Sequence, residues 1–318
     1  MSDSDVMNRD AAFFSLQAEY ERQGVEETLS MGMHRGKRKV LKRKGKEYGR
    51  LSEHIGAFPL VMVAPQDSFL ITGSGEERRK LMDMIISQAD VTYLDALIRY
   101  KKAIEQRNKL LRAGVDDTML YEAIELALCA AAQRIHELRT RWLPQFEAIF
   151  KRYYSDIAGT GENVELRIKA HLNDGISMQQ LLENRRAHDK AVGYTSVGPH
   201  RDDIEIYVNA LDARRTASQG QCKTITVSMR MAQFDFLKQY TGITPILLLD
   251  DIFDKLDSTR VERIVKIVAS ERFHQIFITD TNRDHLDNIL RETANSRKMW
   301  LVEDGNFKPL WNEQTPNP

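Results

Sequence analysis

Residues 12–71 alternate short apolar stretches with polar turns, as in AFFSLQAEY, ERQG and TLSMGMHRG. This pattern predicts strands joined in hairpins. The run PLVMVAP, at residues 59–65, is apolar and bounded by prolines, which is typical of a short buried strand. We therefore expect the chain to begin with β structure.

Helices are predicted from Ser74 to about Tyr154. Ser74 and Glu77 have the spacing of a capping box, in which two side chains satisfy free N–H groups at a helix start. Apolar residues recur further on at intervals of three and four, at Leu120, Ile124, Ala127, Ala131, Ile135, Leu138 and Trp142. With the segment 91–112 and the turn-like RAGVDD, this stripe predicts an antiparallel helix pair. It is ordinary core packing and identifies no ligand.

Strands and helices alternate in the second half of the chain. The segments 163–172 and 202–213 predict strands, and a helix follows from the N-cap Ser218 to about Gly242. PILLLDD and HQIFITDT predict buried strands on either side of the helical RVERIVKIVAS, and KMWLVEDGNFKPL predicts a hairpin with a DG turn. This order favours an α/β fold with a mixed or parallel sheet covered by helices.

The composition narrows the class of protein. The 42% hydrophobic and 29% charged residues are ordinary for a soluble globular chain, and 318 residues fit about two domains. No window approaches a membrane span, and the acidic N-terminus is unlike a signal peptide. Cys129 and Cys222 stand far apart in segments that are predicted to be helical, so they support neither a disulfide framework nor a metal site. We expect a reduced, cytoplasmic protein that does not associate with membranes.

The charge is balanced overall but clustered locally. The 46 basic and 46 acidic residues exclude an argument for nucleic-acid binding from net charge. Residues 35–50, however, hold nine lysines and arginines. Such cations can neutralise DNA phosphates, although lysines also protect exposed strand edges, and composition alone favours the second explanation. The candidate DNA contacts are Lys37, Arg38, Lys39, Lys42, Arg43 and Lys44, with Arg134, Arg139 and Arg141 of the helical segment as competitors.

Two aspartates at the end of a predicted strand carry the first candidate chemistry. In ILLLDDIFDKLD, four apolar residues precede Asp250 and Asp251, at the strand end where α/β folds bind ligands. Mg²⁺ is usually held by one or two carboxylates with waters and phosphate oxygens, and a neighbouring acid can activate a water. We assign Asp250 to the metal and Asp251 to the water, although acid pairs at strand ends also occur without such a role.

The second candidate is SQGQ, about thirty residues before the two aspartates. Ser218, Gln219, Gly220 and Gln221 stand at a predicted helix start, where free N–H groups and the helix dipole attract anions. Glycine there lets a phosphate approach the backbone. Taken alone, the segment is more simply an ordinary helix cap. The eight histidines form no HxxxH or HExxH pair, which leaves a transition-metal site without support.

The order of these segments resembles the ABC-type ATPases. SQGQ, LLLDD, DKLD and FITDT resemble the signature motif, Walker B, D-loop and switch region in that order. Within this superfamily the chain is similar to the RecF family of bacterial DNA replication and repair proteins, from about Phe13 to Phe307. The segments that carry the resemblance are LSEHIG, PLVMVAPQD, GSGEERRKLMD, VGPHRDDIEIYVNALDARRTASQGQCKT, ILLLDDIFDKLD and VEDGNF.

The resemblance implies a role for each matching residue. The signature residues would meet the γ-phosphate of an ATP that a partner subunit mainly holds: Ser218, Gln219, Gly220 and Gln221. Asp250 would take the Walker B role at Mg²⁺, and Asp251 would polarise water. The remaining nucleotide-binding positions would be Asp254 and Asp257 in the D-loop, Thr279 or Asp280 at the switch, and Gln66 in the Q-loop. His200, in GPHRDD, would be structural or close to the nucleotide.

The sequence departs from the family at the Walker A motif, GxxxxGK[ST]. The nearest candidate, GMHRGKR at residues 32–38, is one residue too short and has Arg38 where a hydroxyl should stand. We expect an N-terminally incomplete chain, and a variant without Walker A is the alternative. Weak DNA-dependent ATPase activity is expected of the complete protein, and none of this chain.

The expected fold is an α/β ABC-type ATPase head, in which a P-loop NTPase-like mixed sheet and antiparallel hairpins accompany a helical lobe. Its first strand and P-loop would be missing. We expect three parts: 1–72 with the N-terminal strands of lobe I, 73–195 as the helical arm, and 196–318 with the signature helix, Walker B and the rest of the head.

The resemblance implies an ATP-dependent DNA-binding protein of replication, gap repair and recombination, linked to the SOS response. It would bind single-stranded DNA and single-strand/double-strand junctions, close as an ATP-bound homodimer and work with recombination mediator proteins. The alternative is a non-enzymatic DNA-binding or scaffold fragment. Chromosome proteins with long coiled coils fit less well, because the helical stretch spans only tens of residues.

Overall fold

The computed structural model describes residues 5, 7–22, 24–159, 161–253, 256–281 and 297–313. Its contacts divide the chain into two units, residues 1–58 and 59–318, which are described separately. The three-part division expected from the sequence stays a prediction. No described helix is long and apolar enough to cross a membrane.

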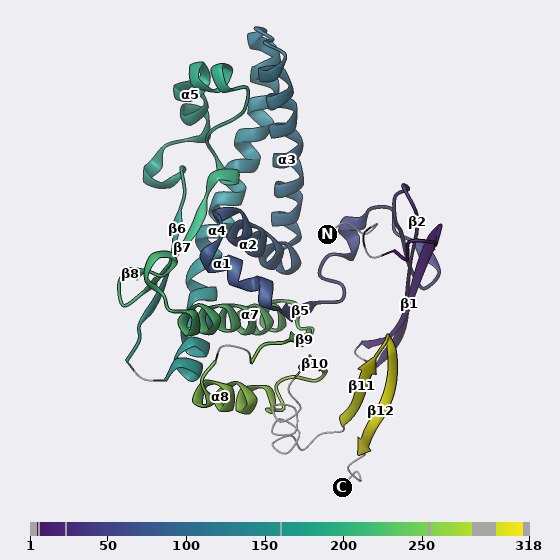
Figure 1. Ribbon diagram of the computed structural model, residues 1–318. Coiled ribbons are helices and arrows are strands. Elements are labelled where there is room, and N and C mark those ends of the chain that lie inside the picture. The colour runs from purple at the N-terminus through teal and green to yellow at the C-terminus, as the bar shows by residue number, and fades with distance from the viewer. Residues whose placement is uncertain are drawn as a thin grey trace. The chain divides into compact units, whose positions relative to one another are not determined.

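The first unit is an antiparallel sheet in the order β1-β2-β3-β4. Its strands are β1 (Phe13–Arg22), β2 (Val25–His34), β3 (Val40–Arg43) and β4 (Lys46–Glu47), and the short 3-10 helix η1 (Leu51–His54) follows. Phe13 pairs with His34 and Arg22 with Val25, so β1 and β2 form a long hairpin, which is purple to blue in Figure 1. The strands and hairpins predicted for this part of the chain are confirmed.

The second unit contains a parallel sheet in the order β10-β9-β5. The strands are β5 (Leu60–Val63), β9 (Ile246–Asp250) and β10 (Ile276–Thr279), and Leu247 and Leu249 of the central strand are fully buried. Helix α7 (Gln219–Thr241) packs against β5, and α8 (Ser258–Val268) connects β9 to β10. This confirms the predicted parallel sheet. Because parallel strands end at one edge, residues that follow the three strands are brought together there.

Two long helices form the arm of the second unit. Helices α3 (Val91–Arg112) and α4 (Thr118–Ala158) run side by side in Figure 1, with α5 (Met178–Val192) beside them. Before them come η2 (Pro65–Ser68), α1 (Phe69–Thr72) and α2 (Gly75–Ala89). The antiparallel pair is confirmed. The predicted stripe is wrong near the start of α4, where Leu120 and Ala127 are exposed and Tyr121 and Leu128 are buried instead.

The start of α2 also differs from the sequence prediction. Ser74 caps the helix as expected, but its hydroxyl accepts a hydrogen bond from the Glu76 N–H, at 3.4 Å. The Glu77 carboxylate, predicted to complete a capping box, is instead paired with Lys80 on the helix surface.

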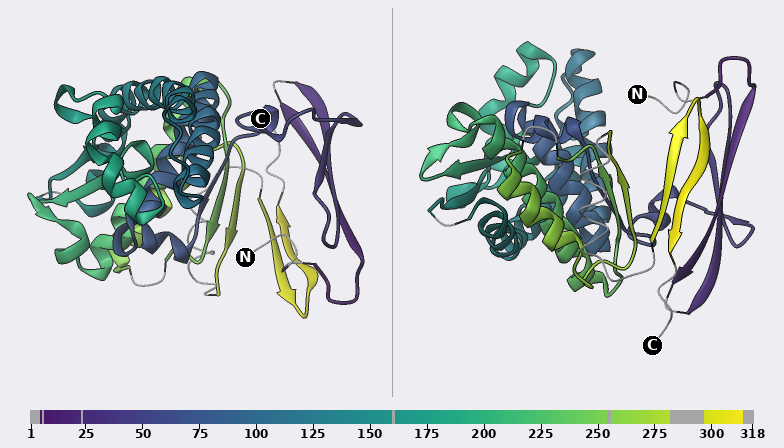
Figure 2. Two further views of the ribbon diagram at one scale, coloured as in Figure 1. Left: turned by 90° about the horizontal axis from the view of Figure 1, so that it is seen from above. Right: turned by 60° about the horizontal axis from the view of Figure 1, so that its bottom comes forward.

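Two smaller antiparallel groups of strands complete the fold. The sheet β6-β7-β8 consists of β6 (Val164–Lys169), β7 (Asp203–Val208) and β8 (Leu211–Asp212), and α6 (Ala213–Thr216) leads from it to α7. The 3-10 turns η3 (Asn173–Gly175) and η4 (Pro199–Arg201) precede β7. The predicted C-terminal hairpin is confirmed as β11 (Arg297–Glu303) and β12 (Asn306–Glu313), the yellow arrows of Figure 2. Asp304 and Gly305 turn it with positive φ angles, as a type I′ turn requires.

Buried arginines fix the arm to the segment that precedes β7. The Arg139 guanidinium, 2% exposed, donates to Asp83, Asp202 and the Pro199 carbonyl at 2.6–2.8 Å. Nearer the far end of the arm, Arg107 is fully buried. It pairs with Glu125 at 2.8 Å and with Asp189 at 2.7 Å.

His200 is a structural residue of this junction. Its Nδ1 lies 2.6 Å from the Tyr100 hydroxyl and its Nε2 lies 2.9 Å from the Thr195 carbonyl oxygen. In the neutral ring, Nε2–H therefore donates to Thr195 and Nδ1 accepts from Tyr100. Burial lowers the pKa of His200 to about 4, so the ring is uncharged at neutral pH.

We expect acid to destabilise the protein through His200. Because its pKa is about 4 in the folded chain and 6.5 without the fold, the unfolded chain binds more protons between these values. The contribution is present above pH 6.5 and falls by at most about 3 kcal/mol as the pH drops to 4. Urea unfolding of wild type and His200→Gln across this range measures it. His200→Gln should show a flatter pH dependence than wild type; equal slopes for the two proteins would contradict the assignment.

Candidate functional site

The candidate site starts at the first turn of α7, which Ser218 caps. The Ser218 hydroxyl accepts from the Gln221 N–H at 3.2 Å, and the Gln221 side chain accepts from the Ser218 N–H at 2.9 Å. These reciprocal bonds form a capping box and confirm the predicted helix start. Ser218 and Gln219 are exposed at the end of the helix where the dipole is positive.

Gly220 lies against an arginine of another helix. A Cβ atom at Gly220 would stand 2.5 Å from Nη1 of Arg260, which belongs to α8. The same guanidinium is 3.5 Å from the carboxylate of Asp257, the residue that caps α8. Glycine therefore lets the Arg260 guanidinium lie over the backbone of the first turn of α7.

A carboxylate also contacts this turn. Glu162 accepts a hydrogen bond from the Gln221 side chain at 2.8 Å and a short one from the Tyr154 hydroxyl. Burial, with a smaller contribution from the Glu162 carboxylate, raises the pKa of Tyr154. Its hydroxyl therefore stays protonated and donates to Glu162. Glu162 and Arg260 were missed by the sequence analysis.

The edge of the parallel sheet gathers three of the predicted site residues. Asp250 ends β9, and Thr279, its partner in the parallel register, ends β10. The Thr279 hydroxyl donates to the Asp250 carboxylate at 2.5 Å. Gln66 follows β5, the third strand that ends at this edge, and is exposed. The structure thus brings Asp250 and Thr279 together, and Asp280 follows directly.

Asp251 leaves the strand in a left-handed conformation. Its φ is +46°, a region that aspartate tolerates better than most residues. Its N–H donates to the Thr279 carbonyl at 3.1 Å, and its own carbonyl accepts from Nζ of Lys223 at 3.3 Å. Lys223 lies in the second turn of α7, so this contact joins α7 to the end of β9.

The D-loop and Q-loop positions are described in part. Asp254 lies outside the described residues. Asp257 caps α8, accepting from the Arg260 N–H at 3.0 Å. Asp67, beside Gln66, pairs with Arg230 of α7 through two hydrogen bonds, a link that the sequence analysis missed. Among the described residues, no group of three or more His, Cys, Asp or Glu side chains is placed to hold a metal ion.

The cations of the basic hairpin in the first unit differ in their contacts. Arg43 forms a bidentate pair with the buried Glu27 carboxylate, and this hydrogen bonding lowers the pKa of Glu27. Lys44 occupies the following turn with a φ of +51°, and Lys39 precedes β3. Three other cations line a hollow of about 430 Å³ together with exposed Phe13 and with His34: Lys37, Arg38 and Lys42.

The three arginines of the helical segment that were candidates for DNA binding differ in burial and in their partners. The prediction that Arg139 could contact DNA is wrong, because its guanidinium is buried and bonded to Asp83, Asp202 and a backbone carbonyl. Arg134 is partly exposed and donates to the Thr92 hydroxyl at 3.1 Å. Arg141 is exposed.

Relatives in sequence identify the family. The chain is 45% identical over 308 residues to the DNA replication and repair protein RecF of Parabacteroides distasonis, covering 97% of this chain and 84% of the relative. It is 46% identical over 306 residues to the RecF of Phocaeicola vulgatus, with 95% and 82% covered. The chain belongs to the RecF family. No family model matches the sequence.

Solved structures agree with the RecF assignment. The recombination mediator protein RecF, solved with ATP in the RecFOR pathway, is 25% identical and superposes with a TM-score of 0.83 over 98% of this chain and 83% of its own. An Smc head domain from Pyrococcus furiosus shares the fold alone, at 15% identity and a TM-score of 0.52 over 97% of this chain and 80% of its own. These comparisons confirm the ABC-type ATPase head fold predicted from the sequence.

We expect Ser218→Ala to destabilise this RecF-family chain by about 1 kcal/mol, because the substitution removes the hydroxyl that accepts from the Gln221 N–H. Urea unfolding at neutral pH measures the change. Gln219→Ala, at the exposed neighbouring position, is the control and should leave stability within about 0.5 kcal/mol. An unchanged midpoint for Ser218→Ala would mean that the cap contributes nothing to the fold.

Proposed function

We propose that this chain is an ATP-controlled DNA-binding protein of DNA repair, whose signature helix meets a nucleotide held by a partner subunit. The observation that carries the proposal is the link between the capped start of α7 and the edge that holds Asp250 and Thr279, made by Lys223 and Asp251. A single rigid helix thus joins an anion-attracting terminus to a strand-end carboxylate. Such an arrangement would couple the partner's γ-phosphate, at the start of α7, to a metal held at this chain's own Asp250.

Each residue at the site has a proposed part. Ser218, Gln219, Gly220 and Gln221 form the first turn of α7. Since the N–H groups of Ser218 and Gln221 are used within the capping box, the Ser218 hydroxyl and the N–H groups of Gln219 and Gly220 would meet the γ-phosphate. Asp250 would hold Mg²⁺, for which its carboxylate and the adjacent Thr279 hydroxyl offer the hard oxygen atoms that this ion prefers. Bound Mg²⁺ would neutralise charge that develops on the phosphate oxygens. Asp251 would orient and deprotonate the attacking water.

The remaining residues of the proposed nucleotide site would contact the nucleotide, its metal or the attacking water. Asp257 would act across the dimer, with Asp254 of the same loop, while Thr279 or Asp280 would sense the γ-phosphate. Gln66 would lie near the metal and the water. Weak, DNA-dependent ATP hydrolysis by the complete protein follows, with ATP closing a homodimer and hydrolysis releasing it.

We propose the basic hairpin as the DNA contact. Lys37, Arg38 and Lys42 form no ion pair with a carboxylate in the part of the chain that the structure describes, so they are free to neutralise phosphates. Lys39 and Lys44 lie in the adjoining turns. Arg43 instead holds Glu27 and is a structural residue of the hairpin.

The proposed ligands are single-stranded DNA and single-strand/double-strand junctions. Exposed Phe13 beside these cations offers a surface on which an unpaired base can stack. The proposed setting is gap repair and recombination within the SOS response, in the cytoplasm, together with recombination mediator proteins. The RecF structure solved in the RecFOR pathway supports this choice of partners.

ATP-dependent dimerisation tests the signature assignment. In a chimaera that adds the N-terminal segment of the Parabacteroides distasonis relative, MgATP should cause dimerisation and Ser218→Arg should abolish it. The larger cation fills the space at the helix start that the γ-phosphate would occupy. Sedimentation velocity with and without MgATP measures the change, and Ser270→Arg, at an exposed position in the turn after α8, is the control. Normal dimerisation of Ser218→Arg would rule the assignment out.

Charge reversal in the hairpin tests the DNA contact. We expect the double substitution Lys37→Glu with Arg38→Glu to weaken single-stranded DNA binding by at least about tenfold and to lower the salt dependence by about two phosphate contacts. Fluorescence anisotropy over a series of salt concentrations measures both quantities. The matched control reverses Lys101 and Lys102, which are exposed on α3. If that control loses as much affinity as the hairpin variant, the loss is not specific to the hairpin and the assignment is contradicted.

A further inference from the structure

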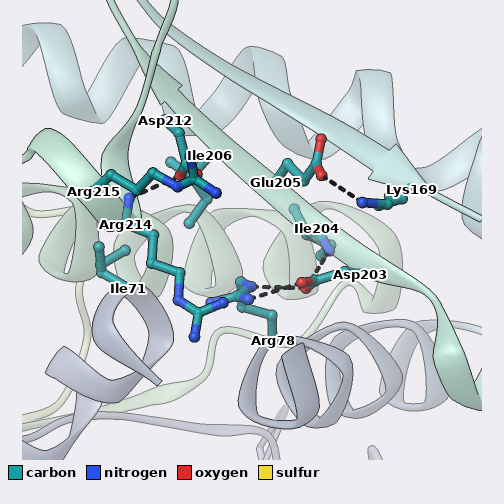
Figure 3. A pocket seen from close by; sticks show the side chains of 10 residues that line it. All are labelled: Ile71, Arg78, Lys169, Asp203, Ile204, Glu205, Ile206, Asp212, Arg214 and Arg215. Carbon is teal, nitrogen blue, oxygen red and sulfur yellow. Dashed lines mark hydrogen bonds and ion pairs between the residues drawn. The ribbon is translucent and has the colours of Figure 1, made fainter. Parts of the chain in front are cut away.

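A second cationic site lies in the second unit, at a cavity of about 210 Å³ between α1, α2, α6 and the β6-β7-β8 sheet. Figure 3 shows the side chains that line it. Four of them are cationic: Arg78, Lys169, Arg214 and Arg215. Three are carboxylates: Asp203, Glu205 and Asp212. The cavity lining thus has one positive charge in excess.

Each carboxylate already has a cationic partner. Asp203 accepts two hydrogen bonds from Arg78, both at 2.8 Å. Glu205 lies 3.5 Å from Lys169, and Asp212 lies 3.6 Å from Arg215. The excess charge therefore belongs to Arg214.

The Arg214 guanidinium has no carboxylate within ion-pair distance among the described residues, although three carboxylates line the same cavity. Only its backbone N–H is used, in a 3.0 Å bond to Asp212. In Figure 3 its side chain extends into the cavity toward Arg78. Two guanidinium groups that approach each other repel, and an anion between them removes that repulsion.

Arg78 lines the cavity with a side chain that is already fixed by its partners. Its side chain is 5% exposed and is held by Asp203 and by the carbonyl groups of Leu70 and Gly73. These contacts use four of the five N–H groups of the guanidinium, which leaves one on Nη2. Because Arg78 is already fixed, binding an anion beside it costs little side-chain entropy.

We propose that this cavity binds a phosphate group, with Arg214 as its main ligand and Arg215, Lys169 and Arg78 around it. A phosphate fits this setting because its several oxygen atoms can accept from more than one cationic group, and the arginine fork matches it in bidentate fashion. The site goes beyond the proposed function, since neither the sheet edge with Asp250 nor the basic hairpin contributes a residue to it.

Two sources could supply the phosphate: a phosphodiester of nucleic acid or the phosphomonoester of a nucleotide. In either case binding would restrain α6, which begins five residues after the end of β7 and is followed directly by Ala217 and the cap Ser218. Occupancy of the cavity would then favour one position of the start of α7.

Titration of the whole chain with inorganic phosphate, followed by ³¹P line broadening, tests the site. We expect wild-type protein to bind phosphate and Arg214→Gln to bind it about tenfold more weakly, a loss of about 1.4 kcal/mol. Arg214 is exposed, so the substitution should leave the fold intact, which thermal unfolding checks. Arg99→Gln, at an exposed position of α3, is the matched control and should bind as wild type does. Lys169→Gln is a second variant and should also weaken binding.

Competition distinguishes the two sources. Displacement of phosphate by a single-stranded oligonucleotide without terminal phosphates would assign the site to nucleic-acid phosphodiesters. Displacement by AMP but not by that oligonucleotide would assign it to nucleotides. Three results would overturn the proposal: no phosphate binding by wild type, equal binding by wild type and Arg214→Gln, or displacement by acetate as effective as by phosphate. None of these measurements depends on dimerisation or on the hairpin.

Discussion

The buried guanidinium of Arg139 joins distant parts of the second unit. It brings Asp83 of α2 and Asp202, the residue before β7, onto the same side chain of α4. A buried charge is tolerable only when its partners are in place, and removing one partner costs roughly 3–5 kcal/mol. The segment that enters β7 is therefore fixed to the arm. From there the chain runs through β8 and α6 to the cap of α7, so this cluster anchors the segment that leads to the start of α7.

The parallel sheet imposes the second constraint, at its carboxyl edge. A strand-end carboxylate alone is a weak indication of function, but the register of β9 and β10 places the Thr279 hydroxyl on Asp250. Lys223 then ties α7 to the turn at Asp251. The strand order thus brings the ends of β9 and β10 together, although α8 separates them in the sequence. Lys223 adds the start of α7 to the same edge.

Local signals were predictable from the sequence and partners distant in the chain were not. Ser218 and Gln221 stand three residues apart, so their capping box follows from spacing. Arg260 over Gly220 depends on how α8 packs, which no local pattern encodes. Arg43 could not be distinguished from its basic neighbours without its partner Glu27.

Arg139 is different, because a signal existed and was not used. It stands four residues after Ile135 and three before Trp142, which puts it on the buried face of α4. The helical period alone therefore argues against an exposed role. At the start of the same helix the predicted buried stripe is displaced by one residue. Tyr121 and Leu128 are buried there in place of Leu120 and Ala127.

The length of α4 gives the molecule a mechanical property. Its 41 residues span about 60 Å, and the rings of Trp142 and Phe146 pack on Phe236 of α7. The part of α4 before Trp142 extends about 36 Å from this contact. A rotation of α4 by only about 5° around that point would displace its far end by about 3 Å. Small adjustments of α7 would therefore be amplified into movements the size of a side chain at the tip of the arm.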